Sequence, residues 1–309
     1  MNIDIIIVTY NRLDKLKKTL SAYNKQSISF RNLIIVNNNS TDDTKKFLDE
    51  WKEEKSSFNK YIIHLTENLG GSGGFYHGEK FAMSLNPDWI FVADDDAYPD
   101  VNMISNFIEF TKSKNTEDIA AICAMVINAD NSIALEHRCY VKSKLGITFN
   151  IYKSKREDYL LDSFNIDLLS YVGSFINVAI MKKAGLVNPR YFIYSDDTEH
   201  SLRLRKKGII ICVPNIKIKH DSGQDIDKND SNIIISWRDY YAIRNSLHMI
   251  IKHKPIAALY ITKNYLIDLL SSRIDSRKKI LLKNAIIDAW KNKLDKHQLY
   301  RPGWKIEKN

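Results

Sequence analysis

Residues 3–12 read Ile-Asp-Ile-Ile-Ile-Val-Thr-Tyr-Asn-Arg, a short aliphatic run that ends in polar side chains. The same combination returns three times in the first hundred residues, with aliphatic runs at 33–36, 61–65 and 89–93. Each run is too short for a helix and is rich in β-branched or aromatic residues, as buried parallel strands are. Between them lie amphipathic stretches typical of helices, at 13–23, 41–51 and 74–85. This alternation predicts an α/β fold with a mostly parallel sheet flanked by helices.

The pattern is more mixed beyond residue 115. We expect a strand at 119–126, a hairpin that runs to about 149, and a strand or turn at 171–181. A helix at 196–207 and a strand at 209–213 should follow. A polar linker at 222–232 predicts a catalytic domain over residues 1–225 and a helical region over 226–309.

The charge of the chain is concentrated at its C-terminal end. The 309 residues carry a formal net charge of +9, and residues 252–309 hold 14 Lys/Arg against 5 Asp/Glu. The rest has 32 basic and 32 acidic residues, and this neutral body argues against a nucleic-acid-binding protein. Three widely spaced cysteines without a Cys-x-x-Cys pair fit a reducing cytosol. The most apolar stretch, 255–270, is too short and too interrupted to predict a transmembrane helix.

Polar or glycine-rich residues follow each of the first four predicted strands. They are Thr9 to Arg12, Asn37 to Ser40, the segment 67–74, and Asp94 to Asp96. Because doubly wound sheets bind ligands beyond the carboxyl ends of their strands, we expect these four segments to form one site.

The triplet Asp94-Asp95-Asp96 predicts a metal site. Adjacent carboxylates repel one another and raise each other's pKa unless a cation neutralises them. The first and third can bind one hard divalent ion, which in turn can hold a diphosphate. A solvated acidic turn is the alternative, but the position at the ligand edge of a sheet favours the metal.

The segment 68–74 contains four glycines in five positions. Glycine allows close approach of the backbone to a bulky ligand, and the following helix start favours anions. The segment matches neither the dinucleotide-binding pattern nor the P-loop. We expect a ligand-facing loop, with a flexible linker as the alternative.

Acidic residues also open the predicted helix at 196–207. Asp196, Asp197 and Glu199 either stabilise the helix dipole or provide a general base that takes a proton from an acceptor hydroxyl. His220 follows a strand-like run, where a histidine is either a structural side chain or a third metal ligand.

Together these motifs resemble glycosyltransferase family 2, whose members have the Rossmann-like GT-A fold. The resemblance rests on Ile-Val-Thr-Tyr-Asn-Arg at 7–12, Asn-Asn-Ser-Thr-Asp at 38–42, the triplet at 94–96, Asp-Asp-x-Glu-x-x-x-Arg at 196–203, and His220. The glycine-rich segment and Tyr-Tyr-x-x-Arg-Asn at 240–245 look like the branch with bacterial galactofuranosyltransferases and rhamnosyltransferases.

The resemblance implies a role for each motif. Asp94, Asp96 and His220 would hold Mn²⁺ or Mg²⁺, and Asp197 would be the catalytic base. The residues that would bind the donor are Thr9, Asn11, Arg12, Asn37, Asn68, Gly70, Gly71 and Asp95. Weaker candidates for the acceptor are Tyr171, Phe175 and Asp196. The family usually has Asp where this chain has Asn37, and the galactan polymerases have a tryptophan-rich motif where this chain has residues 171–177.

The implied reaction is transfer of galactofuranose from UDP-galactofuranose, with inversion, to a hydroxyl of a lipid-linked bacterial surface glycan. A rhamnosyltransferase using dTDP-rhamnose and a UDP-hexopyranose transferase are the nearest alternatives. A sugar-phosphate nucleotidyltransferase shares the sheet, the metal carboxylates and a glycine-rich loop. It typically needs a Lys/Arg-rich loop after the first strand, where this chain has the single Arg12.

The C-terminal region predicts two largely apolar helices, at 256–270 and 280–290. In the second, Lys279, Lys283 and Lys291 recur on one side, as in basic helices that lie on anionic membranes. Packing against the catalytic domain and a homo-oligomer interface are the alternatives. Because the resemblance implies a lipid-linked acceptor, it favours a cytoplasmic protein that is peripheral on the inner face of the cell membrane.

Overall fold

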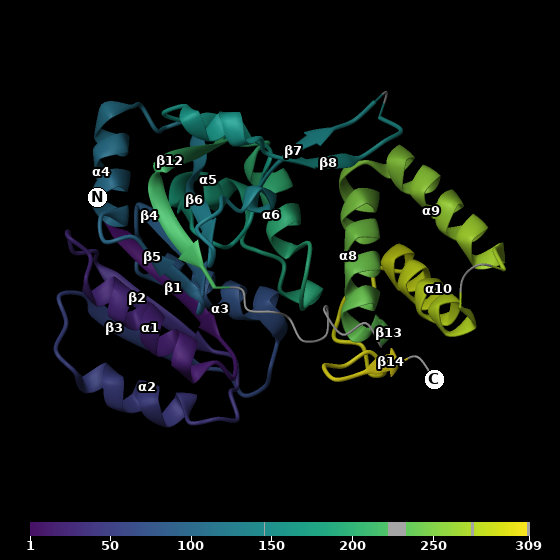
Figure 1. Cartoon of the computed structure of the whole chain (residues 1–309), viewed down its shortest axis with the longest axis horizontal. Coiled ribbons are helices and arrows are strands. Elements are labelled where there is room, and N and C mark those ends of the chain that lie inside the picture. Colours follow the sequence, from purple (N-terminus) through teal and green to yellow (C-terminus); the bar gives the residue numbers. More distant parts are fainter. Residues whose placement is uncertain (145, 222–232, 273–274, 308–309) are drawn as a thin grey trace.

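The computed structural model describes residues 1–144, 146–221, 233–272 and 275–307. The N-terminal part of the chain forms a parallel half-sheet. Its strands stand in the order β3-β2-β1-β4 and all run parallel (Figure 1). Their bounds are β1 Ile3–Thr9, β2 Asn32–Asn37, β3 Asn59–His64 and β4 Trp89–Asp94. The four predicted strands are confirmed, and their carboxyl ends meet at one edge.

The same sheet continues beyond β4 with mixed directions. Strand β11 (Ser174–Asn177) runs antiparallel between β4 and β6 (Ile119–Asn128), and β12 (Ile209–His220) runs parallel to β6. Two short strands, β5 (Ala97–Pro99) and β9 (Phe164–Ile166), pair antiparallel with β12. Strand β12 is longer than the predicted 209–213, because a register shift between Val213 and Lys217 lets it continue to His220.

Helices cover both faces of this sheet. The side chains of β1 alternate, so that Ile5 and Ile7 face one cluster of buried residues while Ile6 and Val8 face the other. The first cluster includes residues of α1 (Leu13–Asn24), α2 (Thr44–Glu53) and α4 (Met103–Ser113). The second includes residues of α3 (Gly70–Ser84), α5 (Val178–Ala184) and α6 (Asp196–Leu204). The predicted α/β fold is confirmed.

Helix α3 begins earlier than the sequence predicted, since Gly70 is already its first residue. The glycine-rich segment is therefore mainly the first two turns of a helix rather than a loop. A Cβ atom on Gly74 would lie 2.4 Å from Val8, and one on Gly78 would lie 2.4 Å from Ile6. These glycines allow the helix to pack directly on β1.

Two small sheets stand outside the main one. The predicted hairpin is β7 (Arg138–Lys142) with β8 (Asn150–Lys153), joined by β10 (Leu168–Leu169). The other sheet pairs β13 (Ile233–Ser236) with β14 (Lys305–Glu307). Short 3₁₀ helices lie at Leu135–His137 (η1), Arg156–Leu160 (η2) and Pro189–Tyr191 (η3).

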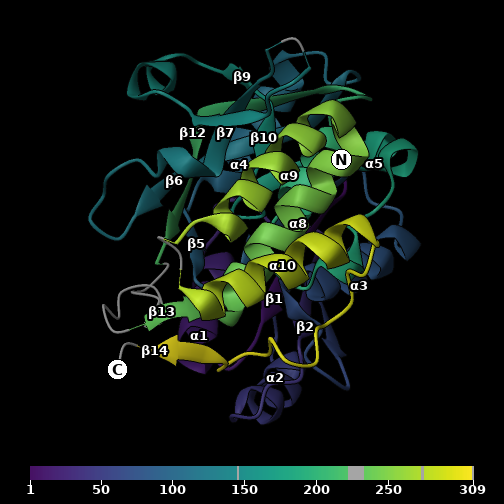
Figure 2. The same ribbon diagram turned by 90° about the vertical axis from the view of Figure 1, so that its right-hand side faces the viewer.

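Three helices form the C-terminal region: α8 (Trp237–His253), α9 (Pro255–Leu270) and α10 (Ser276–Trp290). Figure 2 shows them side by side over one end of the catalytic body. The predicted boundary at 222–232 lies outside the described residues, so the division at residue 225 stays a prediction. Among the described residues, no helix combines the length and apolar character needed to cross a bilayer.

The close packing of α3 on β1 leads to a stability prediction. Gly74→Ala and Gly78→Ala should each lower the free energy of unfolding by about 1–3 kcal/mol, because the added methyl group overpacks the contact. Gly71→Ala is the matched control, because an added Cβ would meet nothing within 4 Å. Urea denaturation without ligand measures the difference, and equal stability of all three variants would contradict the packing role.

Candidate active site

Asparagine side chains tie together the segments that follow the first three strands. Asn11 donates to Thr41 Oγ1 at 3.1 Å and accepts from the Thr41 amide at 2.7 Å, which joins the ends of β1 and β2. Asn38 donates to Asn68 Oδ1 at 3.1 Å and accepts from the Leu69 amide at 2.9 Å, which joins the ends of β2 and β3. The sheet edge is therefore a connected surface, as the sequence predicted.

Asp94, Asp96 and His220 come together beside these segments. Their candidate ligand atoms all lie within 4.8 Å of one another, with Asp94 at the end of β4 and His220 at the end of β12. Asp96 is 1% exposed, and its Oδ1 lies 3.3 Å from His220 Nε2 without a hydrogen bond of regular geometry. A buried carboxylate oxygen in this state, beside a second carboxylate and an imidazole, fits a divalent cation such as Mn²⁺.

The electrostatics of the triplet show how crowded the carboxylates are. Burial, together with the charge of Asp96, raises the pKa of Asp94 to about 7. Burial also raises the pKa of Asp95 to about 6, against the charge of Arg12. Burial would raise the pKa of Asp96 as well, but the facing imidazole of His220 and the Arg12 guanidinium hold it below its usual value. The site therefore stores charge repulsion that a bound cation would relieve.

Arg12 and Lys15 supply positive charge to the triplet. Arg12 Nη1 lies 2.9 Å from Asp96 Oδ2 and 3.3 Å from Asp95 Oδ1, and Lys15 Nζ lies 3.4 Å from Asp96 Oδ2. The resemblance placed Arg12 on the nucleotide, whereas the structure pairs it with these carboxylates.

Two other predicted donor residues are buried. Thr9 donates to Asp95 Oδ2 at 2.7 Å, and Asn37 accepts from the Ser40 amide at 2.9 Å while its nitrogen lies 3.1 Å from His64 Nδ1. Thr9 is 1% and Asn37 2% exposed, and their polar atoms already have protein partners. We therefore expect them to shape the pocket rather than to contact the nucleotide.

The glycines at the start of α3 differ in what they face. Gly70 has φ +73°, and a Cβ there would lie 2.0 Å from the Phe192 carbonyl oxygen. The fold therefore requires glycine at this position, whether or not a ligand binds. Gly71 has open space where a side chain would be. Of the two predicted donor glycines, Gly71 is thus the one that leaves room for a ligand.

The Asp196-Asp197 pair stands at the start of α6. Asp197 Oδ1 accepts from the Thr198 amide at 2.6 Å and from its hydroxyl at 3.1 Å, while burial raises the pKa of Asp197. Burial and the charges of Asp197 and Asp94 raise the pKa of Asp196 to about 8. A raised pKa suits a proton acceptor near neutral pH.

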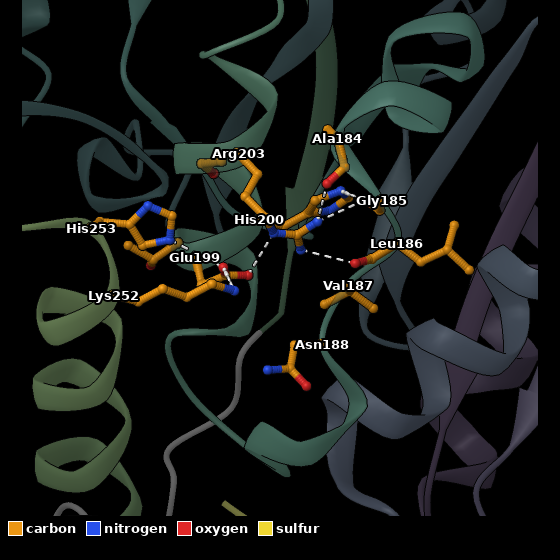
Figure 3. A network of polar contacts seen from close by, with 12 residues as sticks. Ala184, Gly185, Leu186, Val187, Asn188, Glu199, His200, Arg203, Lys252 and His253 are labelled. Carbon is orange, nitrogen blue, oxygen red and sulfur yellow. Dashed lines mark hydrogen bonds and ion pairs between the residues drawn. The ribbon is translucent and has the colours of Figure 1, made fainter. Parts of the chain in front are cut away.

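Glu199 anchors α6 from behind (Figure 3). Its carboxylate is fully buried and lies 2.9 Å from Arg203 Nε, 2.9 Å from Lys252 Nζ and 3.1 Å from His253 Nε2. Arg203 also donates to the carbonyl oxygens of Ala184 and Leu186 at 2.6 and 2.9 Å. The Glu and Arg of the 196–203 motif therefore hold the helix that carries Asp196 and Asp197, and they join it to α8.

A family model described as "Glycosyl transferase family 2" matches residues 4–183, more than half of the chain. The chain belongs to glycosyl transferase family 2. It is therefore a glycosyltransferase, and the predicted family is confirmed.

Curated relatives agree with this assignment. The chain is 31% identical over 149 residues to "Galactofuranosyltransferase GlfT1" of Mycolicibacterium smegmatis, covering 46% of each protein. It is 26% identical over 148 residues to the GlfT1 of Mycobacterium tuberculosis strain H37Rv, covering 46% of this chain and 45% of the relative. The matches thus span slightly less than half the length of these relatives.

Solved structures share the fold of this glycosyltransferase. Staphylococcus aureus TarS 1-349 in complex with UDP aligns with a TM-score of 0.58 and 14% identity, covering 95% of this chain and 82% of TarS. GalNAc-T7 with UDP, GalNAc and Mn²⁺ aligns with a TM-score of 0.61 and 13% identity, covering 94% of this chain and 56% of that one. Both support the predicted GT-A fold.

Two residues predicted to bind the acceptor of this glycosyltransferase are buried in its core. Phe175 is fully buried and stacks on Phe107 with ring centroids 3.8 Å apart, so an acceptor cannot reach it. Tyr171 is 4% exposed, and its hydroxyl lies 2.6 Å from Glu79 Oε1, in contact also with His200. The aromatic pattern in 171–177 belongs to the core, where strand β11 fills the centre of the sheet.

The structure also brings residues to the site that sequence reasoning missed. Lys296, from the segment after α10, donates to the Asn68 carbonyl oxygen at 3.2 Å. His137 lies edge-on to the His220 ring at 5.2 Å between centroids. Asn38 was noticed as part of a motif but was given no role. Neither Lys296 nor His137 has a sequence signal, because each reaches the site only through tertiary packing.

The Glu199 cluster leads to a second stability prediction. Glu199→Gln should lower the free energy of unfolding by roughly 3 kcal/mol, because it leaves the cations Arg203 and Lys252, and the hydrogen-bonded His253, without their carboxylate. Glu136→Gln is the matched control, since the Glu136–Lys153 pair is exposed and worth less than ~1 kcal/mol.

The same comparison has a pH dependence. Burial would raise the pKa of Glu199, but the hydrogen bond from His253 and the charges of Arg203 and Lys252 hold it well below its usual value near 4.5. The pKa of Glu199 is lower in the folded state than in the unfolded state. The stability of the wild type relative to Glu199→Gln should therefore be complete above pH 4.5 and shrink as the pH falls below 4.5. Thermal unfolding at several pH values tests this, and a difference that grows in acid would contradict it.

Proposed function

We propose that this glycosyltransferase moves galactofuranose from UDP-galactofuranose to a hydroxyl of a lipid-linked bacterial surface glycan, with inversion and with a divalent metal. The observation that carries the proposal is the group of Asp94, Asp96 and His220, whose candidate ligand atoms lie within 4.8 Å of one another at the carboxyl edge of the sheet. The similarity to GlfT1 supports the donor sugar. The UDP bound in one TarS structure, and the UDP and Mn²⁺ of GalNAc-T7, support a metal-dependent UDP-sugar site.

Each group has a defined task in this reaction. Asp94, Asp96 and His220 would hold Mn²⁺ or Mg²⁺, which when bound stabilises negative charge on the departing UDP. Asp197 takes the proton from the acceptor hydroxyl while the oxygen of that hydroxyl forms a bond to the anomeric carbon. The bond from that carbon to the UDP oxygen breaks, and UDP leaves with the electron pair. Attack from the side opposite UDP inverts the anomeric configuration.

The donor would lie along the carboxyl edge of the sheet. Asn11 and the ends of β1 and β2 form the nucleotide side, while Asn68 and Gly71 face the sugar and diphosphate. Asp95 and Arg12 act together beside the metal ligands. When metal and diphosphate are bound, Arg12 and Lys15 would be released from Asp96 to face the phosphate oxygens.

The acceptor would reach the base along a groove between β8 and α8. Its lining includes Phe149, Tyr152, Ser246 and Met249. The Ser246 hydroxyl lies 3.4 Å from that of Ser195, which directly precedes Asp196. The groove therefore opens beside the catalytic pair, and its aromatic side chains offer surfaces on which a sugar ring can stack.

The kinetic test uses three carboxylate variants. Asp197→Asn should lower kcat by about 10²–10⁴-fold, the usual contribution of a general base. Asp94→Asn and Asp96→Asn should abolish metal-dependent transfer. Asp130→Asn is the matched control, because this exposed carboxylate bonds to Ser132 and lies outside the proposed site. Release of UDP with and without Mn²⁺ measures the effect.

The donor panel contains UDP-galactofuranose, dTDP-rhamnose and UDP-GlcNAc. Preferred turnover of another donor would contradict the galactofuranose assignment, and release of pyrophosphate would indicate a nucleotidyltransferase. Full activity of Asp197→Asn would remove the assigned base.

We further propose that the protein is cytoplasmic and binds the inner membrane face through α9. Ile256, Leu259 and Leu270 are 59%, 61% and 87% exposed, while α9 buries Ala257 and Ala258. Basic side chains gather near it at Lys254, Lys263 and the start of α10. By contrast, α10 buries Leu281, Leu282 and Ile286, so much of the helix predicted to lie on the membrane packs on the protein. Apolar side chains beside lysines match an anionic bilayer surface.

Vesicle binding tests this surface. The triple variant Ile256→Ser/Leu259→Ser/Leu270→Ser should bind vesicles containing anionic lipid at least about tenfold more weakly, because each buried apolar side chain contributes ~1.5–3 kcal/mol. Leu160→Ser, at an 86% exposed leucine on the catalytic body, should bind like the wild type. Unchanged binding of the triple variant would contradict the proposal. If the wild type binds no vesicles but sediments as a dimer, and the triple variant does not form that dimer, α9 would instead be an oligomer interface.

A further inference from the structure

The segment just before Asp196 has a strained backbone. Phe192, Tyr194 and Ser195 have φ values of 65°, 66° and 63°, in the left-handed region that non-glycine residues rarely adopt. Phe192, with ψ −62°, is the centre of a γ-turn in which the Ile193 amide donates to the Tyr191 carbonyl oxygen at 2.8 Å. Such conformations persist only where the surroundings impose them.

Asn245 on α8 contacts the backbone of this segment at three residues. Its side-chain nitrogen lies 2.9 Å from the Tyr191 carbonyl oxygen, 2.7 Å from that of Ile193 and 3.1 Å from that of Tyr194. The side chain is fully buried. Its two N–H groups are thus shared among three carbonyl oxygens of the strained turn, of which that of Tyr191 also accepts from the Ile193 amide.

Arg244 determines which way this amide points. Its Nε donates to Asn245 Oδ1 at 2.9 Å, which directs the –NH₂ group to the three carbonyls. Its Nη1 donates to the Asp295 carbonyl oxygen at 3.0 Å, and its guanidinium lies over the Tyr241 ring at 4.7 Å. Arg244 therefore connects the C-terminal segment to the same turn.

We propose that Asn245, oriented by Arg244, is a positioning residue that holds segment 191–195 in its strained form, and so aims Asp196 and Asp197 at the donor. This role gives the Arg-Asn pair of the 240–245 motif a function within the active site, although the pair belongs to the C-terminal helical region. The catalytic consequence rests on the proposed transfer reaction, whereas the conformational one does not.

The conformational test is hydrogen exchange of peptides covering residues 191–198. Asn245→Asp keeps the side-chain shape and removes the amide donors, so exchange there should become at least tenfold faster. Arg244→Lys keeps the charge but loses the Nε–H that orients the amide, and it should give a smaller increase in the same peptides. Asn284→Asp is the matched control, because Asn284 in the same helical region donates to Tyr300 Oη at 2.9 Å rather than to a carbonyl oxygen of segment 191–195. Unchanged exchange in Asn245→Asp would overturn the proposal, whatever the substrate is.

The kinetic test separates positioning from folding. In Asn245→Asp, kcat should fall about 10²-fold, as expected when a catalytic group is misplaced by about 1 Å. The KM for the donor and the affinity for UDP with Mn²⁺ should stay within threefold of the wild type, because other elements supply those contacts. Wild-type kcat, or loss of UDP binding together with activity, would overturn the proposal. A wild-type protein that transfers no sugar would instead reject the proposed function.

Discussion

Burial of carboxylates at one edge of the sheet is the constraint on which the rest of this structure depends. Asp95 and Asp96 are 3% and 1% exposed, at the end of the central strand β4, where their charges would repel one another. The protein surrounds them with cations that come from distant parts of the sequence. Arg12 and Lys15 follow β1, and His220 ends β12. The order of the strands brings these groups together, and the asparagines of the neighbouring strand ends keep the edge in shape.

The C-terminal helices complete this site. Lys252 and His253 contact the buried carboxylate of Glu199, and Asn245 donates to the turn that precedes Asp196. Lys296 reaches back to the Asn68 carbonyl oxygen on the donor side. The proposed catalytic pair Asp196-Asp197 is therefore joined to α8 through Glu199 and Asn245, while the candidate metal-binding group lies at the edge of the sheet. The basic charge that distinguishes the tail is partly used inside the protein, while α9 leaves apolar side chains exposed.

Sequence patterns predicted the half-sheet well because each strand is a short apolar run with a polar end. Alternation along β1 places Ile5 and Ile7 on one face and Ile6 and Val8 on the other. The glycine-rich segment was less predictable. Close packing of a helix on a strand and close approach of a loop to a ligand demand the same residue, and only the contacts at Val8 and Ile6 separate them. Phe175 misled for a similar reason, since an aromatic residue serves a core and a sugar-binding surface equally well.

The resemblance to the family added His220 to the candidate metal ligands. By itself, the sequence determined the α/β fold, the gathering of polar strand ends at one edge, and Asp94 and Asp96 as candidate metal ligands. These follow from local patterns and from the rule that parallel strands share a carboxyl edge. Only the tertiary structure decided that Arg12 pairs with the acidic triplet, that Tyr171 is buried, and that Asn245 donates to the turn before Asp196. These contacts join residues 54 to 92 positions apart, and each depends on distances and directions that a one-dimensional pattern does not contain.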